Sequence, residues 1–273
     1  MVTMALSVNS NISSLNAQRQ LQRSTNDLGT TYERLSSGKR INSAKDDAAG
    51  LQISSRLTSQ INGLNQASRN ANDAISLAQT AEGALDEYTN MIQRMRTLAV
   101  QASNGSNTTA DRVALDAEFT ELELELQRIA SSTSFGGVSL LDGTYSAQFQ
   151  VGADSGQTIS ISVTIDFAAL LGVGGDLLDF DAAQTAIDEL DSALALVNGV
   201  RADLGAKQNR FSSVIRSNDN TAQNVSASRS RIEDTDYAKE SAELARSTVL
   251  QQAASSMLAQ ANQQPQIALS LLQ

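Results

Sequence analysis

The sequence contains acidic residues whose grouping could be that of a divalent-metal site. Asp46 and Asp47 are adjacent, and Asp176, Asp179 and Asp181 fall in one short segment. Carboxylate oxygens bind Ca²⁺ and Mg²⁺, but neither group has the ligand spacing, central glycine and terminal glutamate of a calcium-binding loop. We therefore predict that the adjacent pair caps the start of a helix. We predict that the second group lies in a solvated loop and at a helix N-cap.

Side chains for nucleophilic catalysis or cofactor binding are scarce. The chain has no His and no Cys, which excludes a Ser-His-Asp triad, a thiol nucleophile, a disulfide and an ordinary zinc site. The segment Gly172-Val173-Gly174-Gly175 is glycine-rich, but no Lys-Ser or Lys-Thr pair follows it, as a phosphate-binding loop requires. The sequence predicts no catalytic residue, no cofactor and no metal, so the protein is not expected to be an enzyme. Chemistry based on Asp and Glu alone stays open.

Composition narrows the classes of partner. The 273 residues carry a net charge of −10, which argues against nucleic acid or an anionic membrane surface as a partner. The sequence is 41% hydrophobic but only 4% aromatic, without Trp, and a composition of this kind is typical of thin helical bundles. We find no run of the ~20 apolar residues that a membrane span needs. The first residues lack the pattern of a secretory signal, so we expect export by another route.

A long apolar row dominates the first half of the chain. It keeps an unbroken seven-residue spacing through Leu57, Leu64, Ala71, Ala78, Leu85, Ile92 and Ala99. Such spacing makes one stripe along a helix, here from about Asp46 to Ala102, which would be ~80 Å long. Ser43 with Asp46 has the form of a capping box at its start. A helix of this length requires a partner stripe along its whole length.

The second half supplies that partner. From Asp181 onward, the same spacing runs through Leu190, Val197, Leu204, Phe211, Val225 and Ile232. Polar Asn218 lies in this row, where it could set the register or sit at a partly wet seam. Between the two rows, Thr108 with Asp111 caps a shorter helix. Alternation of Ile159, Ile161, Val163 and Ile165 with polar residues predicts a β-hairpin with one wet face.

Each end of the chain forms a further amphipathic helix. The apolar residues that we assign to self-assembly at the two ends are Val8, Ile12, Leu15, Leu21, Leu28, Leu35, Leu250, Met257 and Leu258. Burying the large apolar residues of the first helix contributes ~12 kcal/mol, whereas ordering its backbone costs ~30–40 kcal/mol. We therefore expect the ends to be disordered in the monomer and to fold on assembly. The last helix should end near Pro265.

The predicted fold is mainly α. A long antiparallel helical rod is formed by the N- and C-terminal halves, with a small β-hairpin region at the turn-around. The expected domains are 1–42, a terminal helix and connector, and 43–180, rod helices with the hairpin. They are followed by 181–233, the returning rod helix, and 234–273, a second terminal helix, with a joint at Glu233 to Asp236.

Several segments resemble bacterial flagellin of the short type that lacks the variable outer domains. The most specific is Glu33 to Leu51, ERLSSGKRINSAKDDAAGL. Asn70 to Ser76, Phe149 to Ala153, Ser230 to Ala238 and Leu258 to Gln263 resemble the rod, hairpin and C-terminal arm of the same family. The resemblance covers nearly all of the chain except Phe167 to Asp181.

The resemblance implies a structural subunit of the flagellar filament that serves swimming motility. Such a subunit is exported unfolded by the flagellar type III apparatus and polymerises outside the cell. Its implied partners are further copies of itself, an export chaperone that covers the C-terminal tail, and the cap and hook-associated proteins. A hook–filament junction protein, or a surface-binding module built on the same fold, remains an alternative.

One segment also resembles a recognition site. Residues Ile92 to Gln101 resemble the flagellin segment that a vertebrate Toll-like receptor detects, with Arg94, Leu98 and Glu118 at the positions that matter. Arg94 and Leu98 are four residues apart, so we expect them to share a helix face offset from the buried row. The alternative is that Arg94 pairs with solvent or with Glu118 and that Leu98 packs between subunits.

Overall fold

A computed structural model describes residues 10–170 and 176–270. The chain divides into two compact units, one of Met1–Ser59 with Val225–Gln273 and the other of Gln60–Asn224. Two long helices, α2 (Ala48–Ala102) and α4 (Phe180–Glu233), contribute residues to both units. The mainly α prediction is confirmed. Val8 and the glycine-rich segment 172–175 lie outside the described residues.

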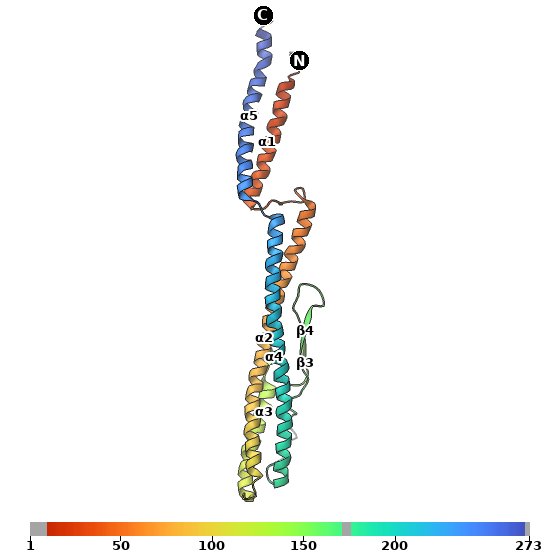
Figure 1. The fold of residues 1–273 in the computed structure, drawn as a ribbon, viewed down its shortest axis with the longest axis vertical. Coiled ribbons are helices and arrows are strands. Elements are labelled where there is room, and N and C mark those ends of the chain that lie inside the picture. Colours follow the sequence, from red (N-terminus) through yellow and green to blue (C-terminus); the bar gives the residue numbers. More distant parts are fainter. Residues whose placement is uncertain (1–9, 171–175, 271–273) are drawn as a thin grey trace. The chain divides into compact units, whose positions relative to one another are not determined.

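In the unit of Gln60–Asn224, α2 and α4 pack against each other and α3 (Thr109–Ser132) lies along α2 (Figure 1). The two seven-residue rows meet in the core of this unit, as predicted. The buried members of the predicted rod core are Leu64, Leu85, Ile92, Leu190, Val197, Leu204 and Phe211. Leu57, which belongs to the other unit, is half-buried. The predicted capping box of Thr108 and Asp111 starts α3.

Ion pairs between α2 and α4 follow one antiparallel register. The Arg96 guanidinium donates to both carboxylate oxygens of Asp191, at 2.6 and 3.0 Å. Further along, the Arg201 guanidinium lies 2.8 Å from the Asp86 carboxylate. Exposed pairs of this kind stabilise a fold by about 0–1 kcal/mol each. Their main effect is therefore to favour this register over a shifted one.

A β-hairpin covers part of the same core. Strands β3 (Tyr145–Gln150) and β4 (Thr158–Val163) pair antiparallel and bury Ile159, Ile161 and Val163, which confirms the predicted alternation. A second, very short pair, β1 (Ser134–Phe135) with β2 (Val138–Ser139), precedes it.

Two asparagines and a glycine dock the end of the hairpin on the helices. The Asn218 side-chain amide donates to the Val151 carbonyl (2.9 Å), and the Asn70 amide donates to the Gln150 carbonyl (3.0 Å). A Cβ atom at Gly63 would lie 2.9 Å from the Cβ of Ala153, so only glycine allows this close approach. Asn218, the polar residue in the apolar row, thus binds the hairpin. Neither of its two predicted roles, setting the register or lying at a partly wet seam, includes this contact.

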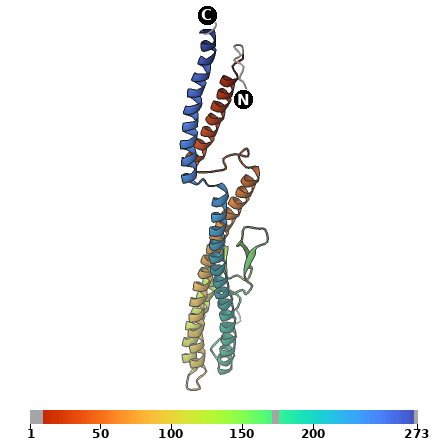
Figure 2. The same cartoon turned by 45° about the horizontal axis from the view of Figure 1, so that its top comes forward.

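In the other unit, α1 (Ile12–Ser37) and α5 (Tyr237–Ser270) run antiparallel side by side, as Figure 2 shows. The buried positions of the seam between them hold mostly small side chains. They are Ser14, Ser24 and Thr31 from α1 and Glu240, Ser247, Ala254 and Ala261 from α5. The Glu240 carboxylate lies 3.6 Å from the Arg34 guanidinium. The Ser24 hydroxyl donates to the Ser247 carbonyl (3.3 Å). Small residues let the two backbones approach closely but bury little apolar area.

The helix α5 continues through Pro265 to Ser270, so the predicted end near this proline is wrong. A proline in the last two turns removes one amide donor and adds a local clash, which need not end the helix.

The connectors before α2 and before α5 pair with each other. The Thr235 amide donates to the Gly38 carbonyl (3.0 Å), and the Arg40 amide donates to the Glu233 carbonyl (2.7 Å). Gly38 ends α1 at φ +71°, and a Cβ atom there would lie 2.9 Å from the Tyr237 hydroxyl. The joint predicted at Glu233 to Asp236 is confirmed, because α4 ends at Glu233 and α5 begins at Tyr237.

The start of α2 differs from the prediction. Asp47 accepts from the Gly50 amide (2.8 Å) and caps the helix at Ala48. Asp46 instead accepts from the Ser43 amide (2.9 Å) and closes the preceding turn. The amides of Ser43 and Asn42, with the Ser43 hydroxyl, hold the pKa of Asp46 below its usual range. The Ser43–Asp46 pair therefore ends the connector rather than starting the helix.

The carboxylate of Glu233 lies at the centre of the joint. It is nearly buried and accepts hydrogen bonds from the Lys39 ammonium and the Ser54 hydroxyl. The bond from Lys39, and then that from Ser54, holds the pKa of Glu233 below its usual value of 4.5.

The Tyr88 hydroxyl is expected to stabilise the core. It is fully buried, donates to the Phe167 carbonyl (2.7 Å), and its ring meets that of Phe167 edge-to-face at 5.5 Å. Replacing Tyr88→Phe leaves a buried carbonyl unpaired, which should lower the free energy of unfolding by about 1–3 kcal/mol. Urea unfolding measures this. Tyr145→Phe, in the same unit, is the control and should change little; an equal loss in both variants would contradict the assignment.

The joint should also weaken in acid. A folded-state pKa below the unfolded value contributes stability above the unfolded pKa, and this contribution is lost as the pH falls. Between about pH 5 and pH 3, the free energy of unfolding should therefore fall more steeply in the wild type than in Glu233→Gln. Chemical unfolding followed at several pH values tests this. Glu243→Gln, an exposed position on α5, should keep the wild-type slope; equal slopes in all three proteins would refute it.

Candidate functional site

Three of the acidic residues with a possible metal chemistry, Asp46, Asp47 and Asp179, accept hydrogen bonds from backbone amides instead. Asp179 accepts from the Phe180 amide (2.6 Å) at the start of α4, while Asp176 and Asp181 are exposed. Within residues 10–170 and 176–270, no three metal-ligating side chains gather. In the same ranges, no helix combines the length and hydropathy of a membrane span.

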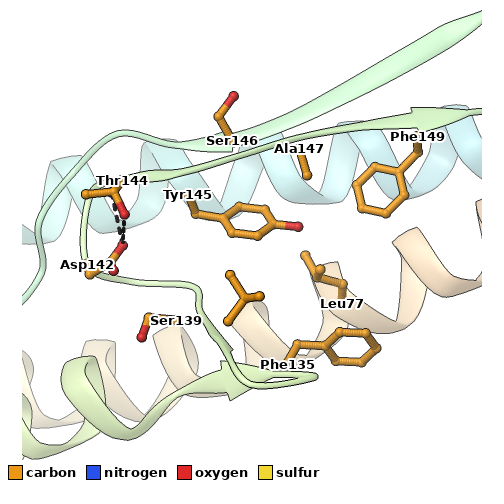
Figure 3. A pocket seen from close by; sticks show the side chains of 10 residues that line it. Leu77, Phe135, Ser139, Asp142, Thr144, Tyr145, Ser146, Ala147 and Phe149 are labelled. Carbon is orange, nitrogen blue, oxygen red and sulfur yellow. Dashed lines mark hydrogen bonds between the residues drawn. The ribbon is translucent and has the colours of Figure 1, made fainter.

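An apolar recess opens between the β elements and α2 (Figure 3). Its volume is about 430 Å³, and its walls include Leu77, Phe135, Tyr145 and Phe149. The one carboxylate among its described lining residues, Asp142, already accepts from the amide and hydroxyl of Thr144 at 3.0 and 2.8 Å. Because acid–base catalysis needs positioned titratable groups near the reacting atoms, this recess suits apolar packing rather than chemistry.

The pair of α1 and α5 leaves several large apolar side chains exposed. Ile12 is 63% exposed on α1 and Met257 is 64% exposed on α5, whereas the buried positions between these helices hold mostly small residues. Leu250 and Met257 are seven residues apart and share one helix face. Large apolar side chains that a helix pair leaves in water make a candidate surface for protein association. We call Ile12, Leu15, Val249, Leu250 and Met257 the outward face.

The structure divides the residues predicted for self-assembly into two groups. Ile12, Leu15, Leu250 and Met257 are exposed, whereas Leu21, Leu28, Leu35 and Leu258 are half-buried along the α1–α5 seam. The second group therefore has partners within the chain. The prediction omitted Val249, which is 63% exposed and adjoins Leu250 on the surface of α5.

Two of the three predicted recognition residues form an exposed pair. The Arg94 guanidinium on α2 lies 2.6 Å from the Glu118 carboxylate on α3, and its Nε donates to the same oxygen at 2.8 Å. The side chains are 54% and 45% exposed, so both remain accessible to a partner.

Leu98, four residues after Arg94 on α2, is not exposed beside this pair. It is 1% exposed and lies in the core, so the prediction that it belongs to an accessible surface offset from the buried row is wrong. The reason is that α3 packs Phe119 and Leu126 into the same core. This packing buries a second side of α2 beyond the row that faces α4.

Comparison with known proteins places the chain in one family. Residues 8–146 match the model of the bacterial flagellin N-terminal helical region, and residues 187–272 match that of the C-terminal helical region. A flagellin of Halalkalibacterium halodurans is 48% identical over 269 residues, covering 97% of this chain and 99% of the relative. Flagellin A of Vibrio anguillarum is 40% identical over an alignment of 379 residues, covering 99% and 100%.

Solved structures agree with these relatives. The crystal structure of Bacillus cereus flagellin matches with a TM-score of 0.52 at 36% identity, over 55% of this chain and 88% of that one. A flagellar hook-associated protein of Vibrio parahaemolyticus matches with a TM-score of 0.59 at 15% identity, over 69% and 100%, which shows a shared fold. From the two regional models and the near-complete relatives, the chain belongs to the bacterial flagellin family.

Proposed function

We propose that this chain, a structural subunit of the extracellular bacterial flagellar filament, assembles through the outward face of α1 and α5. The observation that supports this proposal is the contrast between the small seam residues and the large exposed ones. A soluble helix pair with no further partner would be expected to bury Leu250 and Met257 and to expose Ser247 and Ala254. The reverse arrangement indicates that the apolar side chains pack on neighbouring subunits.

The energetics support association through these helices. Each large apolar side chain contributes about 1.5–3 kcal/mol when it is removed from water. The five residues of the outward face could thus supply several kcal/mol for each subunit added. Contacts that join unlike surfaces of successive copies repeat without closing, and so build a helical polymer.

We assign the assembly domain and the rod to separate segments of the chain. Residues 1–42 and 234–273 form the inner assembly domain, and residues 43–180 with 181–233 form the rod. The buried core of Gln60–Asn224 supports an independently folded rod, because its apolar rows are already covered within the chain.

Export and delivery are part of the same proposal. The chain has no Cys, so no disulfide can oppose unfolding during passage through a type III channel. Before export, the apolar face of α5 would favour premature association. We therefore expect an export chaperone to cover α5, and the cap and hook-associated proteins to contact the same terminal helices.

The alternative functions have less support. Identities of 40% and 48% to flagellins exceed the 15% identity to a hook-associated protein, which shares the fold. A surface-binding module would require a site with convergent polar groups, and the apolar recess offers a single carboxylate that is already paired.

The exposed Arg94–Glu118 pair is our proposed contact for a host Toll-like receptor. An arginine at the centre of an interface is a frequent hot spot, and the Glu118 carboxylate holds its guanidinium in one orientation. Leu98 would act indirectly, by filling the core beneath α2 and α3. A receptor would read this surface on free subunits.

Assembly should fail when charge is placed on the outward face. Met257→Glu should preserve the helix content of the monomer but abolish seeded polymerisation, because burying an unpaired carboxylate is unfavourable. Electron microscopy after seeding provides the measurement. Gln252→Glu adds the same charge at an exposed position of α5 outside the outward face, and should still form filaments. Filaments from both variants would remove the outward face from the assembly interface.

Receptor signalling should depend on the exposed pair. With monomer in a reporter assay, Arg94→Ala and Glu118→Ala should each raise the half-maximal concentration by about tenfold or more. Arg128→Ala is the matched control, since Arg128 forms a comparable exposed pair with Glu125 on α3. Equal responses from all variants, or a response to intact filaments alone, would leave Arg94 and Glu118 with a packing role only.

A further inference from the structure

The chain contains three Asn-Gly pairs in different structural settings. Asn62-Gly63 lies inside α2 and Asn198-Gly199 inside α4, whereas Asn104-Gly105 lies in the turn between α2 and α3. In such a pair, the glycine amide nitrogen can attack the asparagine side-chain carbonyl. Glycine offers no Cβ that would hinder this approach.

The turn at Asn104 leaves both reacting groups accessible. Asn104 and Gly105 are exposed, and among the described residues the Gly105 amide donates to no acceptor. The Ser106 amide donates to the Asn104 side-chain oxygen at 3.2 Å. This bond polarises the carbonyl and can stabilise the oxyanion that forms on attack, as an oxyanion hole does.

The two helical pairs lack this freedom. An amide in the interior of a helix donates to the carbonyl four residues earlier, so the nitrogens of Gly63 and Gly199 are engaged. Gly63 is also held against Ala153. Reaction at either pair requires local opening of a long helix.

We infer that Asn104 is a site of spontaneous deamidation. The Gly105 nitrogen loses its proton to hydroxide and forms a bond to the side-chain carbonyl carbon of Asn104. The carbon–nitrogen bond of the side-chain amide breaks, its nitrogen takes a proton from water and leaves as ammonia, and a cyclic imide results. Water then opens the imide at either carbonyl, to aspartate or to isoaspartate. No redox partner is needed.

The modification would alter the turn. Either product places a carboxylate at the C-terminal end of α2, where the last carbonyl oxygens already carry partial negative charge. Isoaspartate also lengthens the backbone at position 104. This would disturb the turn in which the Asn107 amide donates to the Asn104 carbonyl at 3.1 Å. A subunit outside the cell is beyond cytoplasmic repair, so the change would accumulate with filament age.

Incubating the full-length protein at neutral and mildly alkaline pH, followed by peptide mapping with mass spectrometry, tests the inference. In the folded protein, Asn104 should convert at least about tenfold faster than Asn62 and Asn198, which lie in long helices. In concentrated urea, the three sites should convert at similar rates. The rate at Asn104 should rise in proportion to hydroxide concentration. Similar rates at the three sites in the folded protein, or an unmodified Asn104, would overturn the inference.

Variants of the turn separate the chemistry from folding. A Cβ atom at Gly105 meets no other atom within 4 Å, so Gly105→Ala should fold normally, yet slow conversion by hindering attack. Ser106→Ala keeps the backbone amide that donates to Asn104 and should convert at the wild-type rate. Unchanged conversion in Gly105→Ala would contradict the proposed attack by the Gly105 nitrogen.

Discussion

Covering an apolar row along a long helix is the constraint on which this structure depends. In the unit of Gln60–Asn224 the chain meets it alone, since Leu85 and Ile92 of α2 are fully buried in one core with Leu204 and Phe211 of α4. In the unit that holds α1 and α5, the buried positions of the seam are serines, a threonine, alanines and Glu240, and the leucines along it are only half-buried. Burial of such small side chains contributes little, so the helices there gain their stability from whatever covers their larger residues.

Polar contacts select the arrangement rather than drive it. The bidentate Arg96–Asp191 pair and the Arg201–Asp86 pair align α2 with α4, although each is exposed and individually weak. Asn218 adds a buried amide that is satisfied only when the hairpin is docked. A shifted register would leave this buried amide unpaired, which costs more free energy than the loss of an exposed ion pair.

The elements with a local signal could be predicted from the sequence. Seven-residue rows identified α2 and α4, alternation identified β4, and Thr108 with Asp111 marked the start of α3. Features that depend on packing could not. Leu98 is buried because α3 covers a second side of α2. A second apolar row at seven-residue spacing marks that side, and its members are Leu77, Ala84, Met91 and Leu98. The prediction did not use this row, and the row alone does not say which element covers it.

The same limit applies to the seam and the joint. The sequence shows an apolar row at each end of the chain. Which of its residues lie along the α1–α5 seam and which on the outward face depends on the antiparallel register of the two helices. Ser43 with Asp46 has the pattern of a capping box, yet Asp47, one residue further, makes the capping bond. Because Asp46 and Asp47 are adjacent, either could cap the helix, and the spacing alone does not distinguish them.

Hydrogen exchange compared between monomer and filament tests the central claim most directly. The account predicts that amides of α1 and α5 exchange in the monomer at least about a hundredfold faster than those near Leu85 and Tyr88, because opening the small-residue seam requires little free energy. After polymerisation, amides of α1 and α5 should become as protected as those of the Gln60–Asn224 core. Equal and strong protection of α1 and α5 in the dilute monomer would contradict the account, since the terminal helices would then be stable without neighbouring subunits.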